Sequence, residues 1–157
     1  MKLSSGIARI PEMLKLGVRV GLAVDGSASN DGSDLLEELR TGFLLHRLNS
    51  SSAAPTGYDM LKIATRGSAS ILGRDDIGQI AEGMAADFFL INMDRLSLTG
   101  AQFDVSSMLG TVGYKGNVDY TVVNGRVVVR EGRLTGVDEE KITAEAKQCV
   151  SRYLGRS

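Results

Sequence analysis

The feature that most constrains this fold is a short apolar run that ends at an acidic residue. Residues 17–24 read GVRVGLAV, and Asp25 follows at once, ahead of the small polar loop 26–32. A nearly continuous apolar run suits a strand buried on both faces, as in a parallel sheet. A helical pattern begins directly after the loop, so the chain is predicted to be α/β. In (β/α) barrels, catalytic groups lie at this kind of junction, at the carboxyl ends of the strands.

The other elements are predicted from hydrophobic spacing and turn residues. Ser33 or Asp34 can cap the helix that follows the loop. Asn124-Gly125 is the strongest short-range signal for a β-hairpin. Helices are predicted at residues 11–17, 35–48, 58–72 (with Gly73 as its C-cap) and 138–153. Strands are predicted at residues 18–24, 88–92, 118–123 and 126–130.

This order of elements leaves the first part of the chain incomplete as a domain. One strand-helix unit can neither close a barrel nor complete a sheet, so residues 1–73 are expected to be the tail of something larger. Residues 74–137 are predicted to form a small β unit, and residues 138–157 a terminal helix.

Composition narrows the class of protein. The net charge of -1, the pI near 5.8 and the scattered Lys and Arg argue against binding to nucleic acid or to a membrane surface. No apolar run approaches the roughly 20 residues that span a bilayer, and no signal-peptide pattern is visible. The single cysteine, Cys149, excludes an internal disulfide and a cysteine-based metal site. A cytoplasmic protein is therefore expected.

On the residues alone, Asp25 has two interpretations. It is either a metal ligand or general base at a strand end, or a cap in an Asp-Gly turn. A calcium loop is disfavoured, because an EF-hand needs Gly and Glu where this loop has Asn30 and Leu36. A phosphate cradle is also disfavoured, because Asp25, Asp31 and Asp34 would repel a dianion and the loop contains no Lys.

His46 is the only histidine of the chain. It falls in the last turn of the helix predicted at 35–48, where it can offset the helix dipole or contact free carbonyls. A zinc site needs three or four protein ligands. One histidine without a cysteine cluster cannot supply them, so this chain alone is not expected to form a histidine-rich metal site.

Five motifs occur in order along nearly the whole chain. They are SGIA at 5–8 with Pro11, GVRVGLAVDGSASND at 17–31, ATRGSA at 64–69 with LG at 72–73, IGQI and EGMAAD within 77–87, and VD with VNGRVVV within 118–129. Together they resemble the amidohydrolase superfamily, and most closely its 8-oxoguanine deaminase, hydroxyatrazine hydrolase and chlorohydrolase branch. The aspartate motif and the Gly-x-x-Ala-Asp motif carry most of this resemblance.

The resemblance implies the C-terminal part of a metal-dependent (β/α)8 barrel, with its last strand and helices, plus part of a flanking small β-sandwich domain and a terminal helix. In such hydrolases a divalent metal, zinc or iron, activates a water that attacks a ring carbon bearing an amino or halide group. Asp25 matches the metal-ligating aspartate that also accepts a proton from this water. Ser27, Ser29 and Asn30 match the loop beside the substrate. The implied substrate is a small purine- or triazine-like ring, cleaved at a C–N or C–halogen bond.

The chain also departs from the family pattern. The family's His-x-His pair and two later histidines have no counterpart here, and a whole barrel needs about 250 residues. We therefore expect the C-terminal third of a longer enzyme, inactive and without tightly bound metal when alone. The lone strand 18–24 and helix 35–48 predict self-association into a homo-oligomer. The alternative is a non-catalytic α/β module or oligomerisation domain that folds by itself, with Asp25 as a turn residue.

Overall fold

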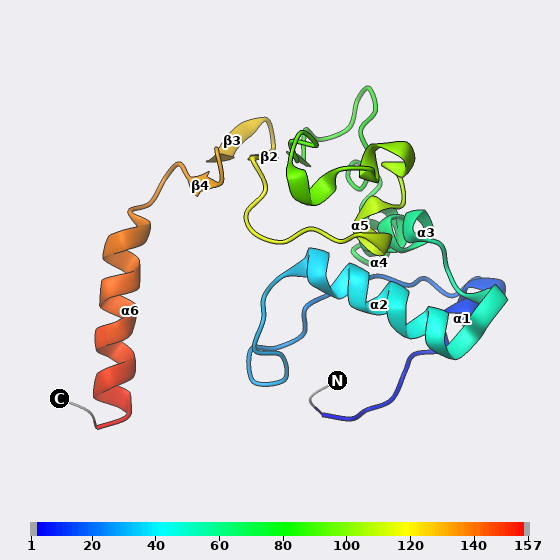
Figure 1. The fold of residues 1–157 in the computed structure, drawn as a ribbon, viewed down its shortest axis with the longest axis horizontal. Coiled ribbons are helices and arrows are strands. Elements are labelled where there is room, and N and C mark those ends of the chain that lie inside the picture. Colours follow the sequence, from blue (N-terminus) through cyan, green and yellow to red (C-terminus); the bar gives the residue numbers. More distant parts are fainter. Residues whose placement is uncertain (1–2, 156–157) are drawn as a thin grey trace. The chain divides into compact units, whose positions relative to one another are not determined.

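The structure is a computed structural model that describes residues 3–155 (Figure 1). Its contacts group the chain into two compact units. The first comprises Met1–Ala86 and Asn92–Gly116, and the second comprises Asp87–Ile91 and Asn117–Ser157. These units do not coincide with the ranges predicted from the sequence. Those ranges refer to the domains of a longer protein, and they stay a prediction.

The first unit is built from helices. In chain order they are α1 (Ile10–Lys15), α2 (Leu35–Ser50), η1 (Ser51–Ala53), α3 (Gly57–Lys62), η2 (Ile63–Gly67), α4 (Ser68–Ile71), η3 (Leu96–Leu98), η4 (Ala101–Asp104) and α5 (Met108–Thr111). Helices α2, α3 and α5 pack on one another around the buried side chains of Leu39, Met60 and Met108. This apolar contact holds the unit together, because burying such side chains stabilises a fold by about 1.5–3 kcal/mol each.

The predicted helices at 35–48 and 58–72 are confirmed, with differences at their ends and in the middle of the second. Asp34 caps α2, and its Oδ1 accepts hydrogen bonds from the N–H groups of Leu36 and Glu37. The second helix is α3, η2 and α4 in continuation, of which η2 is a π-helical turn. It ends at Ile71, and Gly73 follows with a φ of 67°, the left-handed conformation that terminates many helices.

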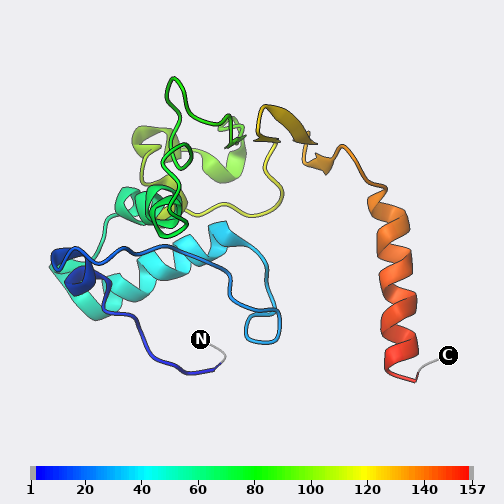
Figure 2. The same cartoon turned by 180° about the vertical axis from the view of Figure 1, so that it is seen from behind.

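The prediction of a strand at 18–24 is wrong for the described chain. This segment is extended but pairs with no other strand within residues 3–155, and Figure 2 draws no arrow on it. It packs instead against η2 and α4, where the Ser68 hydroxyl accepts a hydrogen bond from Leu22 N at 3.2 Å. Gly67 allows this approach, since an added Cβ would overlap the Val20 carbonyl oxygen. A strand is defined by its neighbours, and the described part of the chain supplies none here.

The second unit contains a four-stranded antiparallel sheet in the order β1-β2-β3-β4. The strands are β1 (Phe88–Leu90), β2 (Tyr120–Val123), β3 (Arg126–Arg130) and β4 (Arg133–Leu134). The predicted hairpin is confirmed: Asn124 and Gly125 have φ of 47° and 75° and join β2 to β3. The side chain of Asp87 accepts a hydrogen bond from Asn124 N at 2.5 Å, which ties the turn to the start of β1.

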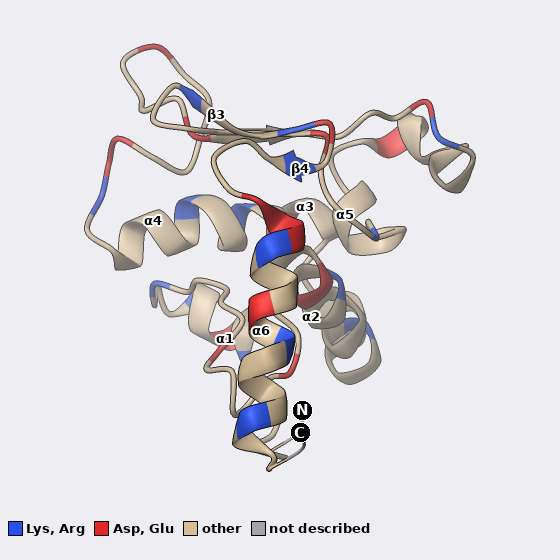
Figure 3. Ribbon diagram, turned by 90° about the vertical axis from the view of Figure 1, so that its left-hand side faces the viewer, with Lys and Arg blue, Asp and Glu red and all other residues tan. Residues whose placement is uncertain are grey.

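The helix predicted at 138–153 is confirmed as α6 (Glu139–Tyr153), and Asp138 caps it by accepting a hydrogen bond from Lys141 N. Acidic residues lie in its first turn and Arg152 in its last, which complements the helix dipole, and Figure 3 shows both charges alternating between these ends. The apolar side chains of α6 are exposed, among them Ile142, Cys149 and Val150. No helix within residues 3–155 is both long and apolar enough to cross a membrane.

Candidate functional site

Asp25 lies where the extended segment 18–24 ends and the polar loop begins. Its φ of 68° is left-handed, a conformation that Asp adopts more readily than most non-glycine residues. One carboxylate oxygen, Oδ1, accepts a hydrogen bond from Gly26 N at 2.7 Å. The side chain is exposed, so the carboxylate is open to solvent and to a ligand.

The loop that follows Asp25 is a compact turn. The N–H groups of Ser29 and Asn30 both donate to Gly26 O, at 2.8 and 3.0 Å. The side-chain amide of Asn30 donates to Val24 O at 2.9 Å and to an oxygen of Glu38 at 2.6 Å. Its carbonyl oxygen accepts a hydrogen bond from Gly32 N at 3.1 Å. The loop is therefore tied both to the extended segment and to α2.

Three of the four residues predicted for the site share one cavity. Asp25, Ser29 and Asn30 line a space of about 600 Å³ between the end of the extended segment, the loop and α2, whereas Ser27 is not on its wall. This volume lies in the range of small-molecule sites. Glu38 lines the same cavity and was not predicted. No sequence signal marks it, because its partner Asn30 lies eight residues away in a loop of irregular conformation.

The cavity has an acidic wall. Four carboxylate residues line it, and no Lys or Arg does; the four are Asp25, Asp31, Glu37 and Glu38. This charge disfavours anionic ligands, in agreement with the argument against a phosphate cradle. Among the described residues, no group of three or more His, Cys, Asp and Glu side chains is placed to hold a metal ion. The residues of this chain therefore do not fit a catalytic zinc by themselves.

His46 is buried and lies within hydrogen-bond distance of two backbone carbonyl groups. Its side chain is 5% exposed, with Nδ1 at 2.7 Å from Gly42 O and Nε2 at 3.1 Å from Ala8 O. A neutral imidazole has one N–H and can donate to only one of these carbonyls. The contact with Ala8 links the N-terminal segment to α2. His46 is not in the last turn, because α2 continues to Ser50.

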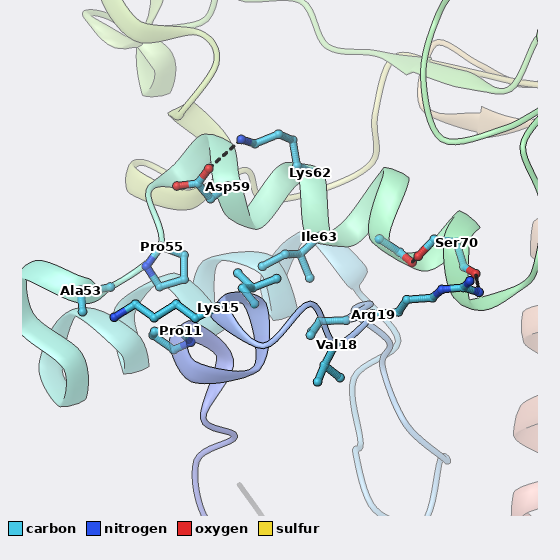
Figure 4. A pocket seen from close by; sticks show the side chains of 14 residues that line it. Pro11, Lys15, Val18, Arg19, Ala53, Pro55, Asp59, Lys62, Ile63 and Ser70 are labelled. Atoms are coloured by element: carbon cyan, nitrogen blue, oxygen red, sulfur yellow. Dashed lines mark hydrogen bonds and ion pairs between the residues drawn. The ribbon is translucent and has the colours of Figure 1, made fainter.

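A second cavity of about 540 Å³ lies between α1, the start of the extended segment and α3 (Figure 4). None of the predicted site residues lines it. Arg19 reaches across its edge and donates to Ser70 O at 3.1 Å. At another edge Lys62 pairs with Asp59 at 2.7 Å. The hydrogen bond from Lys62, followed by the one from Thr56, lowers the pKa of Asp59 to about 2.

Comparison with known proteins shows the family to which the sequence is similar. The profile of the Amidohydrolase family matches residues 1–128. Hydroxydechloroatrazine ethylaminohydrolase of Pseudomonas sp. strain ADP is 45% identical over 94% of this chain, which covers 31% of that protein. The 5-methylthioadenosine/S-adenosylhomocysteine deaminase of Pelotomaculum thermopropionicum is 40% identical over 99% of this chain, which covers 36% of it.

Two crystal structures have similar folds. Atrazine chlorohydrolase from Arthrobacter aurescens TC1, complexed with zinc, matches with a TM-score of 0.85 and 38% identity over 91% of this chain and 32% of its own. An adenosine deaminase from Xanthomonas campestris with bound zinc matches with a TM-score of 0.87 and 28% identity over 96% of this chain and 35% of its own. The chain thus spans about a third of the length of the proteins it matches.

Proposed function

Because this chain belongs to the Amidohydrolase family, we propose that it forms the C-terminal third of a metal-dependent hydrolase. The whole protein would cleave a C–N or C–halogen bond of a small purine- or triazine-like ring. The relatives support this choice, since they are an ethylaminohydrolase, a deaminase and a chlorohydrolase. These matches favour an enzyme over the alternative of a non-catalytic module.

The observation that carries the proposal is the position of Asp25. An exposed carboxylate closes the extended segment and faces a cavity large enough for a heteroaromatic ring. In the whole protein, Asp25 would serve as a metal ligand and accept a proton from the attacking water. The other ligands would come from residues outside this chain, because the described residues do not form a metal site.

The loop residues would have different roles. Ser29 lines the cavity and would contact the substrate. Ser27, which lies off the wall, would need a movement of the loop to reach it. Asn30 lines the cavity as well, but both N–H groups of its amide already donate to protein oxygens, so it would shape the site more than bind the ring.

The first experiment uses the chain as it is. Purified protein is analysed for metal and assayed with hydroxydechloroatrazine and 5-methylthioadenosine. We expect no turnover and no stoichiometric zinc, because one carboxylate cannot hold the metal. Tightly bound zinc together with turnover would contradict the proposal that this chain is inactive alone.

The second experiment restores the missing part. A chimera joins the N-terminal two-thirds of hydroxydechloroatrazine ethylaminohydrolase to this chain, which aligns with 31% of that enzyme at 45% identity. We expect turnover, and we expect Asp25→Asn to lower it by about 10²- to 10⁴-fold, as for the loss of a general base. A folded, zinc-loaded chimera in which Asp25→Asn retains full activity would refute the role of Asp25.

A further inference from the structure

The structure assigns Glu38 to the site as a positioning residue: through Asn30 it holds the loop that carries Asp25. The conformational part of this inference stands on the contacts alone, and its catalytic consequence rests on the proposed function. The hydrogen bond that carries this role joins Glu38 to the side chain of Asn30. The effect of Glu38 on Asp25 would pass through the side chain of Asn30.

Asn30 forms the link between three parts of the site. Its amide donates one hydrogen bond to Glu38 Oε1 at 2.6 Å and another to Val24 O at 2.9 Å, and its carbonyl oxygen accepts one from Gly32 N at 3.1 Å. Both donors of the side chain are therefore occupied. A carboxylate acceptor makes the bond to Glu38 the strongest of the three, since hydrogen bonds to charged groups are about twice as strong as neutral ones.

Glu38 is suited to act as the fixed end of this chain of contacts. It lies in the first turn of α2, whose N-terminus Asp34 caps. Its neighbour along the helix, Leu39, is 1% exposed and anchors α2 in the core. The partly buried side chain of Glu38 can therefore hold Asn30 from a rigid element.

Asp25 depends on this support because little else fixes it. Its carboxylate accepts a hydrogen bond from the N–H of Gly26, the next residue, and its backbone is left-handed. The carbonyl of Val24, which Asn30 holds, belongs to the peptide unit that enters Asp25. Losing the contact between Glu38 and Asn30 would free this peptide unit, and the carboxylate would sample more orientations. Displacements of about 1 Å cost catalysis about 10²-fold.

The conformational test uses NMR on this chain with three variants. Glu38→Ala removes the acceptor, whereas Glu38→Gln keeps an oxygen at the same position. Glu37→Ala is the matched control, because it removes an acidic residue from the same first turn of α2 and keeps the Asn30–Glu38 hydrogen bond. Far-UV circular dichroism verifies that each variant keeps its helices.

We expect Glu38→Ala to shift the side-chain amide resonances of Asn30 and to speed exchange of the Ser29 and Asn30 backbone amides about tenfold, the effect of one lost charged hydrogen bond. Glu38→Gln should restore most of both. If Glu38→Ala behaves like Glu37→Ala in both readouts, or if Glu38→Gln gives no rescue, the positioning role is refuted.

The catalytic test uses the chimera described above. Glu38→Ala should lower kcat by about 10- to 100-fold with little change in KM, and Glu38→Gln should recover most of the loss. A rise in KM alone would mean that Glu38 contacts the substrate, which overturns the inference. A fully active Asp25→Asn chimera would instead refute the proposed role of Asp25, and the NMR readouts would still decide whether Glu38 positions the loop.

Discussion

At the scale of single residues, Asp25 is constrained by its backbone as well as by its carboxylate. Its left-handed φ of 68° disfavours β-branched side chains. We predict that Asp25→Asn keeps the stability of the chain, whereas Asp25→Val lowers the free energy of unfolding by about 1–3 kcal/mol. Urea denaturation followed by circular dichroism measures both. Ser27→Val, in the same exposed loop but with an ordinary φ, is the control, and equal losses at both positions would contradict the prediction.

The same scale shows what the sequence could reveal about the site. Asp25 could be proposed from the sequence because an apolar run, an acidic residue and a small polar loop follow one another along the chain. Glu38 could not, because its contact with Asn30 depends on how the loop folds back on α2. Asn30 was predicted as a substrate contact, which stays a prediction, and its hydrogen bonds to Val24, Glu38 and Gly32 could not be read from the sequence. Burial of His46 against Ala8 likewise depends on a contact 38 residues apart.

At the scale of elements, the helix that begins with α3 depends on a capping box. Thr56 accepts a hydrogen bond from Asp59 N, and the Asp59 side chain accepts one from Thr56 N. The hydrogen bonds from Lys62 and Thr56 lower the pKa of Asp59 from 3.8 to about 2, so the folded protein favours the charged form of this carboxyl group. This stabilisation is complete above about pH 5 and is lost as the pH falls through 3.8 to about 2.

We therefore predict that Asp59→Asn destabilises the chain at pH 7 and that its difference from the wild type shrinks as the pH is lowered from 5 to 2. Thr56→Ala should cost about 1 kcal/mol at pH 7, the usual loss for an N-cap. Urea titrations across this pH range test both. Thr56→Ser keeps the hydroxyl and should retain wild-type behaviour. A difference between wild type and Asp59→Asn that does not change with pH would contradict the prediction.

Elements differed in how well their local sequence predicted them. Asp34, Gly73 and the pair Asn124-Gly125 marked two helices and a hairpin, because caps and turns are decided by neighbouring residues. The π-helical turn η2 was missed, since no local signal distinguishes it from an α-helix. Helix α5 was missed too, because its four residues are helical through contacts with α2 and α3. Segment 18–24 has the composition of a strand but no partner within residues 3–155.

At the scale of the whole molecule, the extended segment predicts self-association. Within residues 3–155, only Val18 and Leu22 of this segment use their N–H groups in hydrogen bonds, and the Val18 side chain is 44% exposed. An unpaired, apolar extended segment is a template for pairing with another chain. We predict that sedimentation velocity shows dimers or larger species at micromolar concentration, and that the amides of residues 19–23 exchange more slowly as the concentration rises.

A charge placed on this segment tests where the contact lies. Ala23→Lys should shift the population toward monomer, because charged residues on an edge oppose pairing. Ala81→Lys puts the same charge on an exposed position elsewhere and should leave association unchanged. A monomer at all concentrations, with residues 18–24 well protected from exchange, would contradict the prediction and favour a self-contained module.

The unpaired segment 18–24 also determines how long the chain would survive among proteases. These enzymes bind their substrates as extended strands and read side chains next to the cut, and residues 18–24 already have that form. Arg19, within the segment and exposed, is a cleavage signal for trypsin-like enzymes. Cleavage there would separate α1 from the loop that carries Asp25. Until a partner covers it, the segment that leads to Asp25 is also a place where proteases can cut. The lifetime of the chain in the presence of protease would therefore report on its assembly.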